Sequence, residues 1–454
     1  MGGKRHTLYP VTIRHTSGPT SKSPVAGVQR APQAIGIGDV PPHQKQPECG
    51  QAGKDTPLQL LKKQPGPIIP ITEYSDVTTM LVPGIEITEI PVTDHMTWAF
   101  ATFRDDQGIT ATIELGRSRI DAEYDRILVD MVKSLSGIEI PDDTAVENLL
   151  GLDTASLQAD FTLAQVVSAV RSAIFEFDCL HKGISLSEAL GSEPTDSVAL
   201  YANVNHSVLR GRNPHHFARA SALAVDDGFT IVKCAAFDYL PASPVKDNTL
   251  EAAQSGLDQV AEVRRAVGPD IEVLVDCHSR FDEQTAPEIA KKLTEHGVGW
   301  FEEPLQPITD LDGLARVATQ VDIQTAGGED GYGADFFMRL VESGASAIAM
   351  PDVKVCGGVA ETRRSAIAAT KAGGRVSLHG PSGPLSQLAG AHVTAATPYA
   401  MPLEYAANQV PWRSEMTTPP EHVHAGRLML PKGPGTGATL DDKVVAQRGR
   451  RWRI

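Results

Sequence analysis

The sequence predicts an α/β barrel preceded by a smaller α+β domain, and three observations support this fold class. Between about residues 198 and 404, short β-rich runs alternate with helical stretches. The runs are apolar throughout rather than alternating, which is typical of parallel strands covered on their outer face. Seven of the eight runs close on an ionisable residue, as expected where strand ends line the mouth of a barrel.

The segments before the barrel differ in composition. Residues 1–78 are rich in Pro, Gly, Gln, Ser and Thr without a sustained hydrophobic period, so we predict a flexible low-complexity extension rather than a small ordered domain. Residues 79–197 open with three strand-like runs, GIEITEIPV, MTWAFATFRDDQG and ITATIELG, in which DDQG forms a turn. Helical periodicity follows in LAQVVSAVRSAIFEFDCLHKGISLSEALGS and ends at Gly191. This pattern predicts an α+β domain.

Residues 198–404 contain the eight predicted barrel strands, which are VALYANVN, FTIVKCAAFD, IEVLVDCH, VGWFEEP, IQTAGGED, AIAMPDV, RVSLHG and AMPLEY. Helical stretches such as SGLDQVAEVRRAV separate them. Connections of this length join parallel strands through crossovers, so a closed barrel is the most economical arrangement. Residues 405–454 form a separate C-terminal segment.

The charge and cysteine content exclude several classes of protein. The 454 residues carry a formal net charge of −15, which argues against a nucleic-acid or membrane-surface partner, because either needs a basic field. The five cysteines include no CxxC pair, so neither a disulfide framework nor a structural zinc site is indicated. With no apolar run of about 18 residues and no signal-like N-terminus, we expect a cytoplasmic protein without a membrane span.

The residues that close the predicted strands recur about once per β/α unit, and they are Lys233, Asp276, Glu302, Glu329, Asp352, His379 and Glu404. Three consecutive strands supply the carboxylates Asp276, Glu302 and Glu329. Converging carboxylates repel one another unless a hard divalent cation lies between them, and all-oxygen ligands suit Mg²⁺ better than Zn²⁺. We therefore predict a Mg²⁺ site, although any single acid could instead cap a helix or accept a loop hydrogen bond.

Asp352 and His379 close the next two strands. A carboxylate bound to one nitrogen of an imidazole fixes its tautomer and raises its basicity. We predict that His379 is a general base oriented by Asp352. The alternative is a structural histidine that caps the HGPSGP turn.

Six motifs in this order resemble the enolase superfamily, in its mandelate racemase-like and acid-sugar dehydratase branches: VLVD, WFEEP, GGED, MPDVKVCGG, SLHGPSGP and LEY. RSAIFEFDCLHKGISLSEALGS resembles the last helices of that superfamily's capping domain, and GRLMLPKGPGTGATLD resembles its C-terminal return to the cap. The resemblance covers about residues 80–443. It implies a modified TIM barrel, (β/α)7β, with an N-terminal α+β capping domain, and a homo-oligomer.

The resemblance also implies roles for the strand-end residues. Asp276, Glu302 (the first acid of FEEP) and Glu329 are expected to bind Mg²⁺. His379, paired with Asp352, is expected to abstract a proton α to a carboxylate, since the superfamily combines a Lys or His base with Mg²⁺. Glu404 is expected to face the substrate and hydrogen-bond the developing enediolate.

Strand two departs from a common pattern of the superfamily. Many racemases and cycloisomerases have Lys-x-Lys there, whereas Lys233 is followed by Cys234 and Ala235. The usual second base of a racemase is therefore missing. We expect Lys233 to contact the substrate carboxylate or a metal-binding acid, the alternative being a buried ion pair with Asp276 or Asp238.

Strand three carries the other departure. Where many members have Asp-x-Asn, this chain has Asp276-Cys277-His278 followed by Arg280, which resembles the galactonate and mannonate dehydratase-like members. Residues i and i+2 of a strand point the same way, so Asp276 and His278 can share the mouth while Cys277 faces outward. The resemblance implies that His278 protonates the leaving hydroxyl, unless it only orients a metal ligand. Arg280 is expected to contact the substrate rather than form a salt bridge.

Other candidate substrate-binding residues lie outside these motifs. Asn203 and Asn205 follow strand one and could bind substrate hydroxyls, although Asn at a strand end is also ordinary turn chemistry. His95 and Trp98 lie in PVTDHMTW, where the superfamily's cap reaches over the site. For Trp98, packing between domains is the alternative.

The predicted activity is that of a carbon–oxygen hydro-lyase acting on a small carboxylate. Mg²⁺-dependent removal of the α-proton and then of the β-hydroxide would convert an aldonate or aldarate into a 2-keto-3-deoxy acid. An epimerase, racemase or lactone cycloisomerase is the alternative among enzymes. A barrel that binds metal and ligand without catalysis is the alternative from another class.

Overall fold

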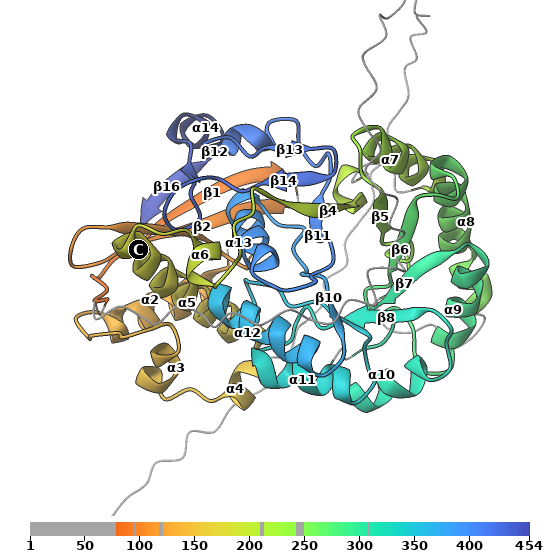
Figure 1. The fold of residues 1–454 in the computed structure, drawn as a ribbon, viewed down its shortest axis with the longest axis horizontal. Coiled ribbons are helices and arrows are strands. Elements are labelled where there is room, and N and C mark those ends of the chain that lie inside the picture. The colour runs from red at the N-terminus through yellow and green to blue at the C-terminus, as the bar shows by residue number, and fades with distance from the viewer. Residues whose placement is uncertain (1–78, 95, 118–120, 209–212, 242–248, 307–308) are drawn as a thin grey trace, which may run out of the picture. The chain divides into compact units, whose positions relative to one another are not determined.

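The computed structural model describes residues 79–94, 96–117, 121–208, 213–241, 249–306 and 309–454. The prediction for residues 1–78 and the candidate His95 lie outside these ranges. Within them the predicted fold class is confirmed, because an antiparallel sheet with helices precedes a parallel α/β barrel (Figure 1).

The antiparallel sheet has the strand order β16-β1-β2-β3. Strands β1 (Glu86–Thr93), β2 (Met96–Arg104) and β3 (Thr110–Glu114) are joined as two hairpins, and β16 (Arg450–Arg453) pairs with β1 from the other end of the chain. The predicted DDQG turn lies between β2 and β3. There Asp105 accepts hydrogen bonds from the backbone N–H groups of Gln107 and Ile109 at 3.1 and 2.7 Å, which closes the turn.

The helices that pack with this sheet are α2 (Ala122–Leu135), α3 (Ala145–Leu150), α4 (Thr154–Ala159), α5 (Phe161–Lys182) and α6 (Leu186–Ala189). The single helical stretch predicted to run to Gly191 is divided in two. Gly183 has a left-handed φ of 69° and ends α5, because glycine adopts this conformation without steric cost. The serine at position 185 then caps α6 through its side chain.

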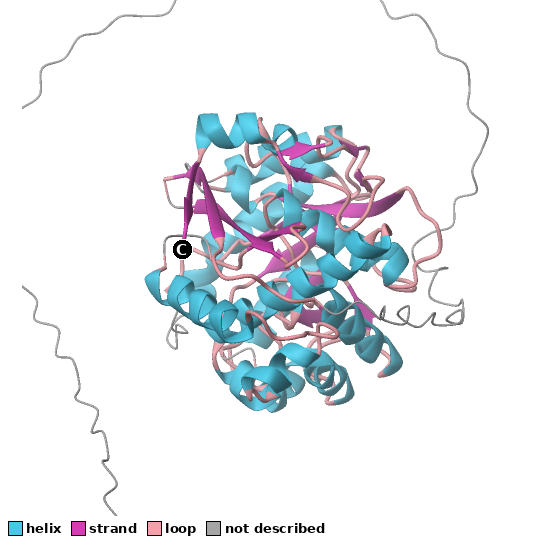
Figure 2. Cartoon of the chain, turned by 90° about the vertical axis from the view of Figure 1, so that its left-hand side faces the viewer, coloured by secondary structure: helices cyan, strands magenta, loops and turns pink. Residues whose placement is uncertain are grey.

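The barrel alternates strands and helices in chain order. Its strands are β4 (Ser197–Asn203), β5 (Ile231–Cys234), β6 (Glu272–Asp276), β7 (Val298–Glu302), β8 (Gln324–Gly327), β9 (Ile348–Ala349), β10 (Arg375–Val376) and β11 (Leu403–Ala406). The helices between them are α7 (Pro214–Asp226), α8 (Thr249–Val267), α9 (Ala286–Glu295), α10 (Leu311–Ala318), α11 (Gly333–Glu342), α12 (Gly358–Lys371) and α13 (Pro384–Ala395). Figure 2 shows these helices around the strands.

The sheet closes on itself. Neighbouring strands from β4 to β10 pair in parallel, and β11 pairs with β4 in register Glu404 to Tyr201. On its other side, the chain entering β11 is joined to β10 by a hydrogen bond of 2.8 Å from Met401 N–H to the Val376 carbonyl. All strand carboxyl ends therefore face one mouth, which is where barrels of this kind carry their sites.

Side-chain alternation divides the barrel into two layers. The outer layer packs against the helices and includes Val275, Cys277 and Phe301. The inner layer is a separate small cluster with Leu274 and Trp300. Because successive side chains of a strand point to opposite faces, Asp276 and Glu302 continue the inner layer at the mouth.

Two further observations concern the cysteines and the helices of the described ranges. Cys179, Cys234, Cys277 and Cys356 are buried free thiols. Every helix in the described ranges is too short or too polar to cross a lipid bilayer.

A buried carboxyl group fixes the C-terminal turn near α5. Glu176 accepts hydrogen bonds from the backbone N–H and the hydroxyl of Thr436 at 2.9 and 3.2 Å. Burial raises the pKa of Glu176 from 4.5 to about 7, against the opposing effect of these hydrogen bonds. A carboxyl pKa that is higher in the folded state favours folding below pH 4.5, and this contribution is lost as the pH rises through 7.

We therefore expect Glu176→Gln to be about as stable as the wild type at pH 5 and more stable at pH 8. The gain should approach about 3 kcal/mol, since each pKa unit corresponds to about 1.4 kcal/mol. Denaturant unfolding at the two pH values measures the difference. An equal difference at both would show that Glu176 does not titrate in this range.

Candidate active site

Two of the three predicted metal-binding acids lie side by side at the barrel mouth. Asp276 and Glu302 are register partners across β6 and β7, and both are almost completely buried. Glu329 follows β8 and is more accessible, with a side chain 25% exposed. The structure therefore places all three at neighbouring strand ends.

Each of these acids contacts a cationic side chain. The Lys233 ammonium lies 2.5 Å from Glu302 Oε1 and 3.8 Å from Asp276 Oδ2. His278 Nε2 lies 2.9 Å from Asp276 Oδ2, and His379 Nε2 lies 3.1 Å from Glu329 Oε2. In this conformation, no three His, Cys, Asp or Glu side chains of the described ranges are grouped so that they could hold a metal ion. The metal site remains a prediction, which the oxygen donors and the concentrated negative charge support.

Lys233 is part of the barrel interior and has no exposed surface. Its ammonium also lies 2.7 Å from Glu404 Oε1. Burial would lower the pKa of Lys233, but the charges of Glu302 and Glu404 raise it well above its usual value. Lys233 therefore contacts acids rather than an open space. Its nearest partner, Glu302, is one of the predicted metal-binding acids, while Asp276, named in the alternative ion pair, lies farther away.

Glu302 is held from a second side by the barrel core. The indole N–H of Trp300 donates a hydrogen bond of 3.0 Å to Glu302 Oε2, while Oε1 faces Lys233. The Trp300 side chain is 2% exposed. Burial raises the pKa of Glu302 in spite of the nearby Lys233 charge. The two donors fix the direction of this carboxylate before any ligand binds.

His379 is paired as predicted with Asp352, whose Oδ2 lies 2.8 Å from the imidazole Nδ1. Burial alone would lower the pKa of His379, but the Glu329 charge and the Asp352 hydrogen bond raise it to about 10. With Nδ1 facing Asp352, Nε2 is directed toward the mouth, where it meets Glu329. This is the geometry of an oriented base, although its role stays a prediction.

The loop after His379 is fastened by three separate parts of the chain. Glu404 accepts a hydrogen bond from Gly380 N–H at 3.2 Å, and Arg413 donates to the Ser382 carbonyl at 2.6 Å. Glu114, at the end of β3, accepts from Gly383 N–H at 2.7 Å. The antiparallel domain therefore holds the start of α13, which has no capping side chain of its own.

His278 lies in a tight turn rather than on the strand. His278 and Ser279 have left-handed φ angles of 44° and 58°, and Arg280 N–H donates to the Cys277 carbonyl at 3.1 Å. Such angles at two successive non-glycine residues are sterically unfavourable and are typical of functional sites. The turn, rather than strand alternation, directs the imidazole toward Asp276.

Both nitrogens of His278 contact carboxylates. Nδ1 lies 2.5 Å from Asp238 Oδ1, and Nε2 contacts Asp276. The Asp276 charge, with the hydrogen bond that His278 donates to Asp238, raises the pKa of His278 to about 12 in spite of burial. The two carboxylates beside its nitrogens favour the protonated imidazole, which is the form that a proton donor needs.

Three of the residues predicted to contact the substrate bind other protein groups in this structure, and their roles stay predictions. Asn203 donates to Glu404 Oε1 at 2.7 Å and accepts from the backbone of Asn205. Asn205 accepts from Ala235 N–H at 2.6 Å. Glu404 is fully buried and bound to Lys233, so it faces no open space. These polar groups are used inside the protein, and the turn chemistry considered for the two asparagines accounts for them.

Trp98, also predicted as a substrate contact, is buried in this structure. Its side chain is 4% exposed and packs edge to face against Trp412, with ring centroids 5.5 Å apart, and near the Arg413 guanidinium. It belongs to a small apolar cluster between β1, β2 and the C-terminal segment. Packing, the alternative for this residue, is therefore what the structure shows.

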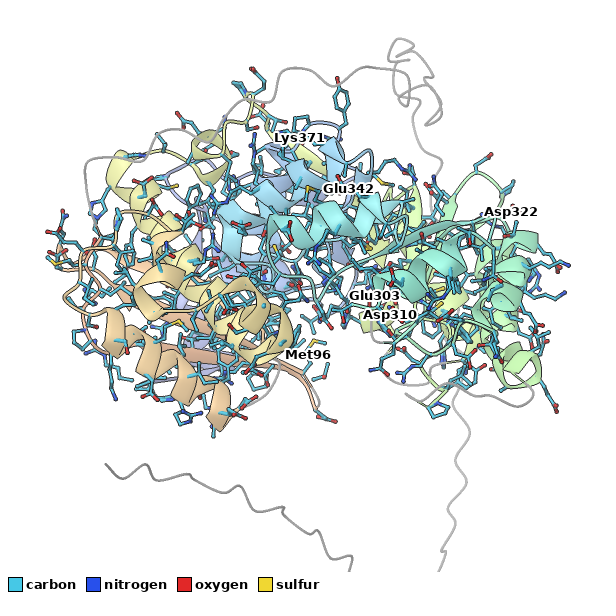
Figure 3. The ribbon with its side chains drawn as sticks, turned by 90° about the horizontal axis from the view of Figure 1, so that it is seen from below. Met96, Glu303, Asp310, Asp322, Glu342 and Lys371 are labelled. Carbon is cyan, nitrogen blue, oxygen red and sulfur yellow. The ribbon has the colours of Figure 1, made fainter. Side chains whose placement is uncertain are left out.

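A cavity of about 340 Å³ opens at the ends of β6, β7 and β8, and we call it the mouth cavity. Its lining includes His278, Glu303, Glu329 and Asp330 from the barrel, and Gln158 and Phe161 from the α4–α5 junction. Figure 3 labels Glu303, which lines the mouth cavity, and Met96, the first residue of β2. The mouth is thus bounded by helices of the antiparallel domain as well as by barrel loops.

Several residues of the site were not predicted from the sequence to be part of it. Glu303 accepts hydrogen bonds from Gly328 and Glu329 N–H at 3.2 and 3.3 Å and so positions Glu329. Its place beside Glu302 in FEEP could have suggested it. Asp238, the partner of His278, closes the strand-two run and could have been suggested in the same way. For Gln158 and Phe161 the sequence carries no comparable signal.

Comparison with known proteins agrees with this architecture. Residues 216–444 match the family described as "Enolase C-terminal domain-like". A solved member of the enolase superfamily from Salmonella Typhimurium superposes with a TM-score of 0.71 at 22% identity, over 83% of this chain and all of that one.

Two curated relatives are dehydratases. The chain is similar to a D-xylonate dehydratase of Haloferax volcanii, at 25% identity over 381 residues, 82% of this chain and 88% of the relative. It is also similar to a D-gluconate dehydratase of Thermoproteus tenax, at 28% identity over 291 residues, 64% of this chain and 57% of the relative, so the match spans little more than half of that enzyme. Because the family match covers half of the sequence and includes the strand-end residues from Lys233 to Glu404, the chain belongs to the enolase superfamily.

Proposed function

We propose that this protein is a Mg²⁺-dependent sugar-acid dehydratase that forms a 2-keto-3-deoxy acid. One observation carries the proposal: two His–Asp pairs, His379–Asp352 and His278–Asp238, flank the three strand-end acids. A β-elimination needs both a base for the α-proton and an acid for the leaving hydroxyl. The dehydratase names of the two curated relatives support the same reaction class.

The metal would be held by Asp276, Glu302 and Glu329. When bound, Mg²⁺ supplies positive charge that stabilises the anion formed on the substrate carboxylate. The residues themselves fit this ion, because they are oxygen donors with surplus negative charge. Their present contacts with Lys233, His278 and His379 show that cations are already drawn to each of them.

His379 takes the α-proton in this proposal. Its Nε2 faces the mouth while Asp352 holds Nδ1, and in the neutral imidazole, which a cation offsetting the Glu329 charge would favour, the lone pair of Nε2 can accept the proton. The electron pair of the broken C–H bond passes into an enediolate of the carboxylate. Asp352 then stabilises the imidazolium that results.

His278 gives a proton to the β-hydroxyl. The electron pair of the enediolate forms the C=C bond, the C–O bond breaks, and water leaves with the His278 proton. The resulting enol ketonises to the 2-keto acid. Ala235, in place of the second lysine, provides no base on the opposite face, which favours elimination over racemisation.

The direct test is to incubate the purified protein with Mg²⁺ and a library of aldonic, aldaric and uronic acids and to measure 2-keto acid formation. Turnover of at least one acid is expected. α-Proton exchange with D₂O or lactone turnover without loss of water would instead establish an epimerase or a cycloisomerase. Ligand binding without turnover across the panel would identify a non-catalytic barrel.

The His278→Asn variant should separate the two half-reactions. We expect dehydration to fall by about 10²- to 10³-fold, because a general acid contributes this much, while α-proton exchange with D₂O continues. Asp238→Asn, which leaves the imidazole less well oriented, should show a smaller loss in the same direction. Dehydration rates and NMR of the α-position provide the measurements. Loss of both half-reactions in His278→Asn would contradict a role limited to the leaving group.

A further inference from the structure

A second cavity, of about 350 Å³, lies on the other side of His278, and we call it the Gln259 cavity. Its lining includes Ala235 and Asp238 after β5, Arg280 after β6, and Gln259 from α8. His278 lines both this cavity and the mouth cavity. The proposed proton donor is therefore shared by the linings of both cavities.

Two buried donors in the lining have no hydrogen-bond partner among the described residues. They are the side-chain Nε2 of Gln259 and the Nε of Arg280. Gln259 is 5% exposed, so water has little access to it. A buried donor without an acceptor costs about 1–3 kcal/mol, and such groups are rare in folded proteins. Both belong to side chains that line one cavity, so a ligand that carries acceptor oxygens is the partner that this cavity can offer them.

Local packing directs Gln259 into this space. A Cβ at Gly256 would lie 2.5 Å from the Phe237 ring, so this glycine allows α8 to approach the end of β5 closely. Gln259 follows about one turn later. Tyr239 ties the same loop to α8, because its hydroxyl donates to the Ala252 carbonyl at 2.7 Å.

The small side chain of Ala235 leaves room here. A lysine at this position would extend four methylene groups and an ammonium toward His278 and the cavity. The absence of a lysine at position 235 thus removes a base and leaves space at the position that its side chain would occupy. The space is lined by the group that would protonate the β-hydroxyl, so a substrate chain that extends past His278 would enter it.

We propose that the Gln259 cavity binds the distal, oxygen-bearing end of the substrate, with Gln259 and Arg280 as donors. This subsite rests on the proposed function. It adds the class of substrate, which is an acid whose carbon chain is long enough to extend past His278. The acceptor oxygens belong either to the hydroxyls of an aldonate or to the terminal carboxylate of an aldarate. Arg280 can pair with either, and its charge favours the carboxylate.

Calorimetric binding in the presence of Mg²⁺ tests this without requiring turnover. The probes are glycerate, which has no distal end, D-gluconate and D-galactonate, and the dicarboxylates D-glucarate and galactarate. The wild type should bind at least one six-carbon acid more tightly than glycerate. Gln259→Leu and Arg280→Met should each reduce that preference about tenfold or more, as expected when a hydrogen-bonding site loses its donor.

Gln254→Leu is the matched control. Gln254 lies on the same helix, is exposed, and donates a hydrogen bond of 2.8 Å to Asp258. Gln254→Leu should leave the preference for six-carbon acids unchanged.

Gln259→Glu keeps the shape of the side chain, so it provides a second test if the leucine variant misfolds. If it weakens the dicarboxylates more than the monocarboxylates, the distal group is a carboxylate; equal weakening assigns hydroxyls.

The outcomes separate this proposal from the proposed function. If the preference falls in the variants but no acid is dehydrated, the cavity is a distal subsite and the proposed reaction is wrong. If acids are dehydrated and the preference is the same in the wild type, Gln259→Leu and Arg280→Met, the subsite is wrong and the reaction stands. Equal loss of glycerate and six-carbon binding in these variants also overturns the subsite.

Discussion

The His379→Asn variant is expected to lose about 10³-fold in turnover, within the range of 10² to 10⁴ that a general base contributes. Asparagine can keep a hydrogen bond to Asp352 but cannot accept a proton at the position of Nε2. Because α-proton removal precedes elimination, D₂O exchange should be lost together with dehydration. This distinguishes the variant from His278→Asn, in which exchange should continue.

The same variant should still bind a divalent ion, which Mn²⁺ titration followed by electron paramagnetic resonance measures without reference to activity. His296→Asn is a matched control, since this histidine ends α9 on the outside of the barrel and its backbone carbonyl accepts from Arg264. Full activity in His379→Asn would show that the base has been wrongly assigned. Loss of Mn²⁺ binding would place its effect at the metal site instead.

The arrangement of strand-end acids could be predicted because it follows from periodicity. Parallel strands recur once per β/α unit and end at one mouth, so residues as distant in sequence as Asp276 and Glu329 become neighbours. The His379–Asp352 contact follows in the same way from adjacent strands. Side-chain alternation also explains why Cys277 packs outward while Asp276 faces inward.

Local backbone geometry explains what could not be predicted at strand three. Nothing in the sequence indicates that His278 and Ser279, neither of them glycine, adopt left-handed angles. Strand alternation predicted Asp276 as the neighbour of His278, and the two are neighbours, but the turn rather than the strand brings them together. The contact with Asp238 depends on how two loops approach one another, which a single sequence does not reveal.

Contacts among buried groups explain why other predicted site residues lie away from open space. Asn203 and Glu404 were expected to face the substrate, yet they bind each other beneath the mouth. Trp98 was expected over the site, yet it packs beside Trp412. Each residue type is compatible with both positions, and only the three-dimensional packing decides between them. The same holds for Gln259, which lies in the middle of a helix and carries no motif.

Replacement of Lys233 by methionine should have the largest effect on stability. Its ammonium is the nearest cation to Glu302 and Glu404 inside the barrel, and all three side chains are buried. Lys233→Met keeps most of the volume but leaves buried negative charge unpaired. Removing one partner of a buried ion pair typically costs about 3–5 kcal/mol. We expect a loss of this size in the free energy of unfolding at pH 8.5 without metal.

The loss in Lys233→Met should depend on pH and on the metal. Burial already raises the pKa of Glu302, and removal of Lys233 should raise it further above the unfolded value. The deficit should therefore be largest at pH 8.5 and shrink as the pH falls toward 5.5, where the carboxyl group takes up a proton. Excess Mg²⁺ at pH 8.5 should restore part of the stability, since it replaces the missing charge.

Denaturant unfolding at both pH values, with and without Mg²⁺, measures these effects. Lys292→Met is the control, because its ion pair with Glu295 is exposed at 3.1 Å and such pairs contribute about 0–1 kcal/mol. A loss below about 1 kcal/mol in Lys233→Met, or one independent of pH, would mean that the buried acids do not depend on this lysine. Other groups would then balance the negative charge of Glu302 and Glu404, and Mg²⁺ would not restore the stability of the variant.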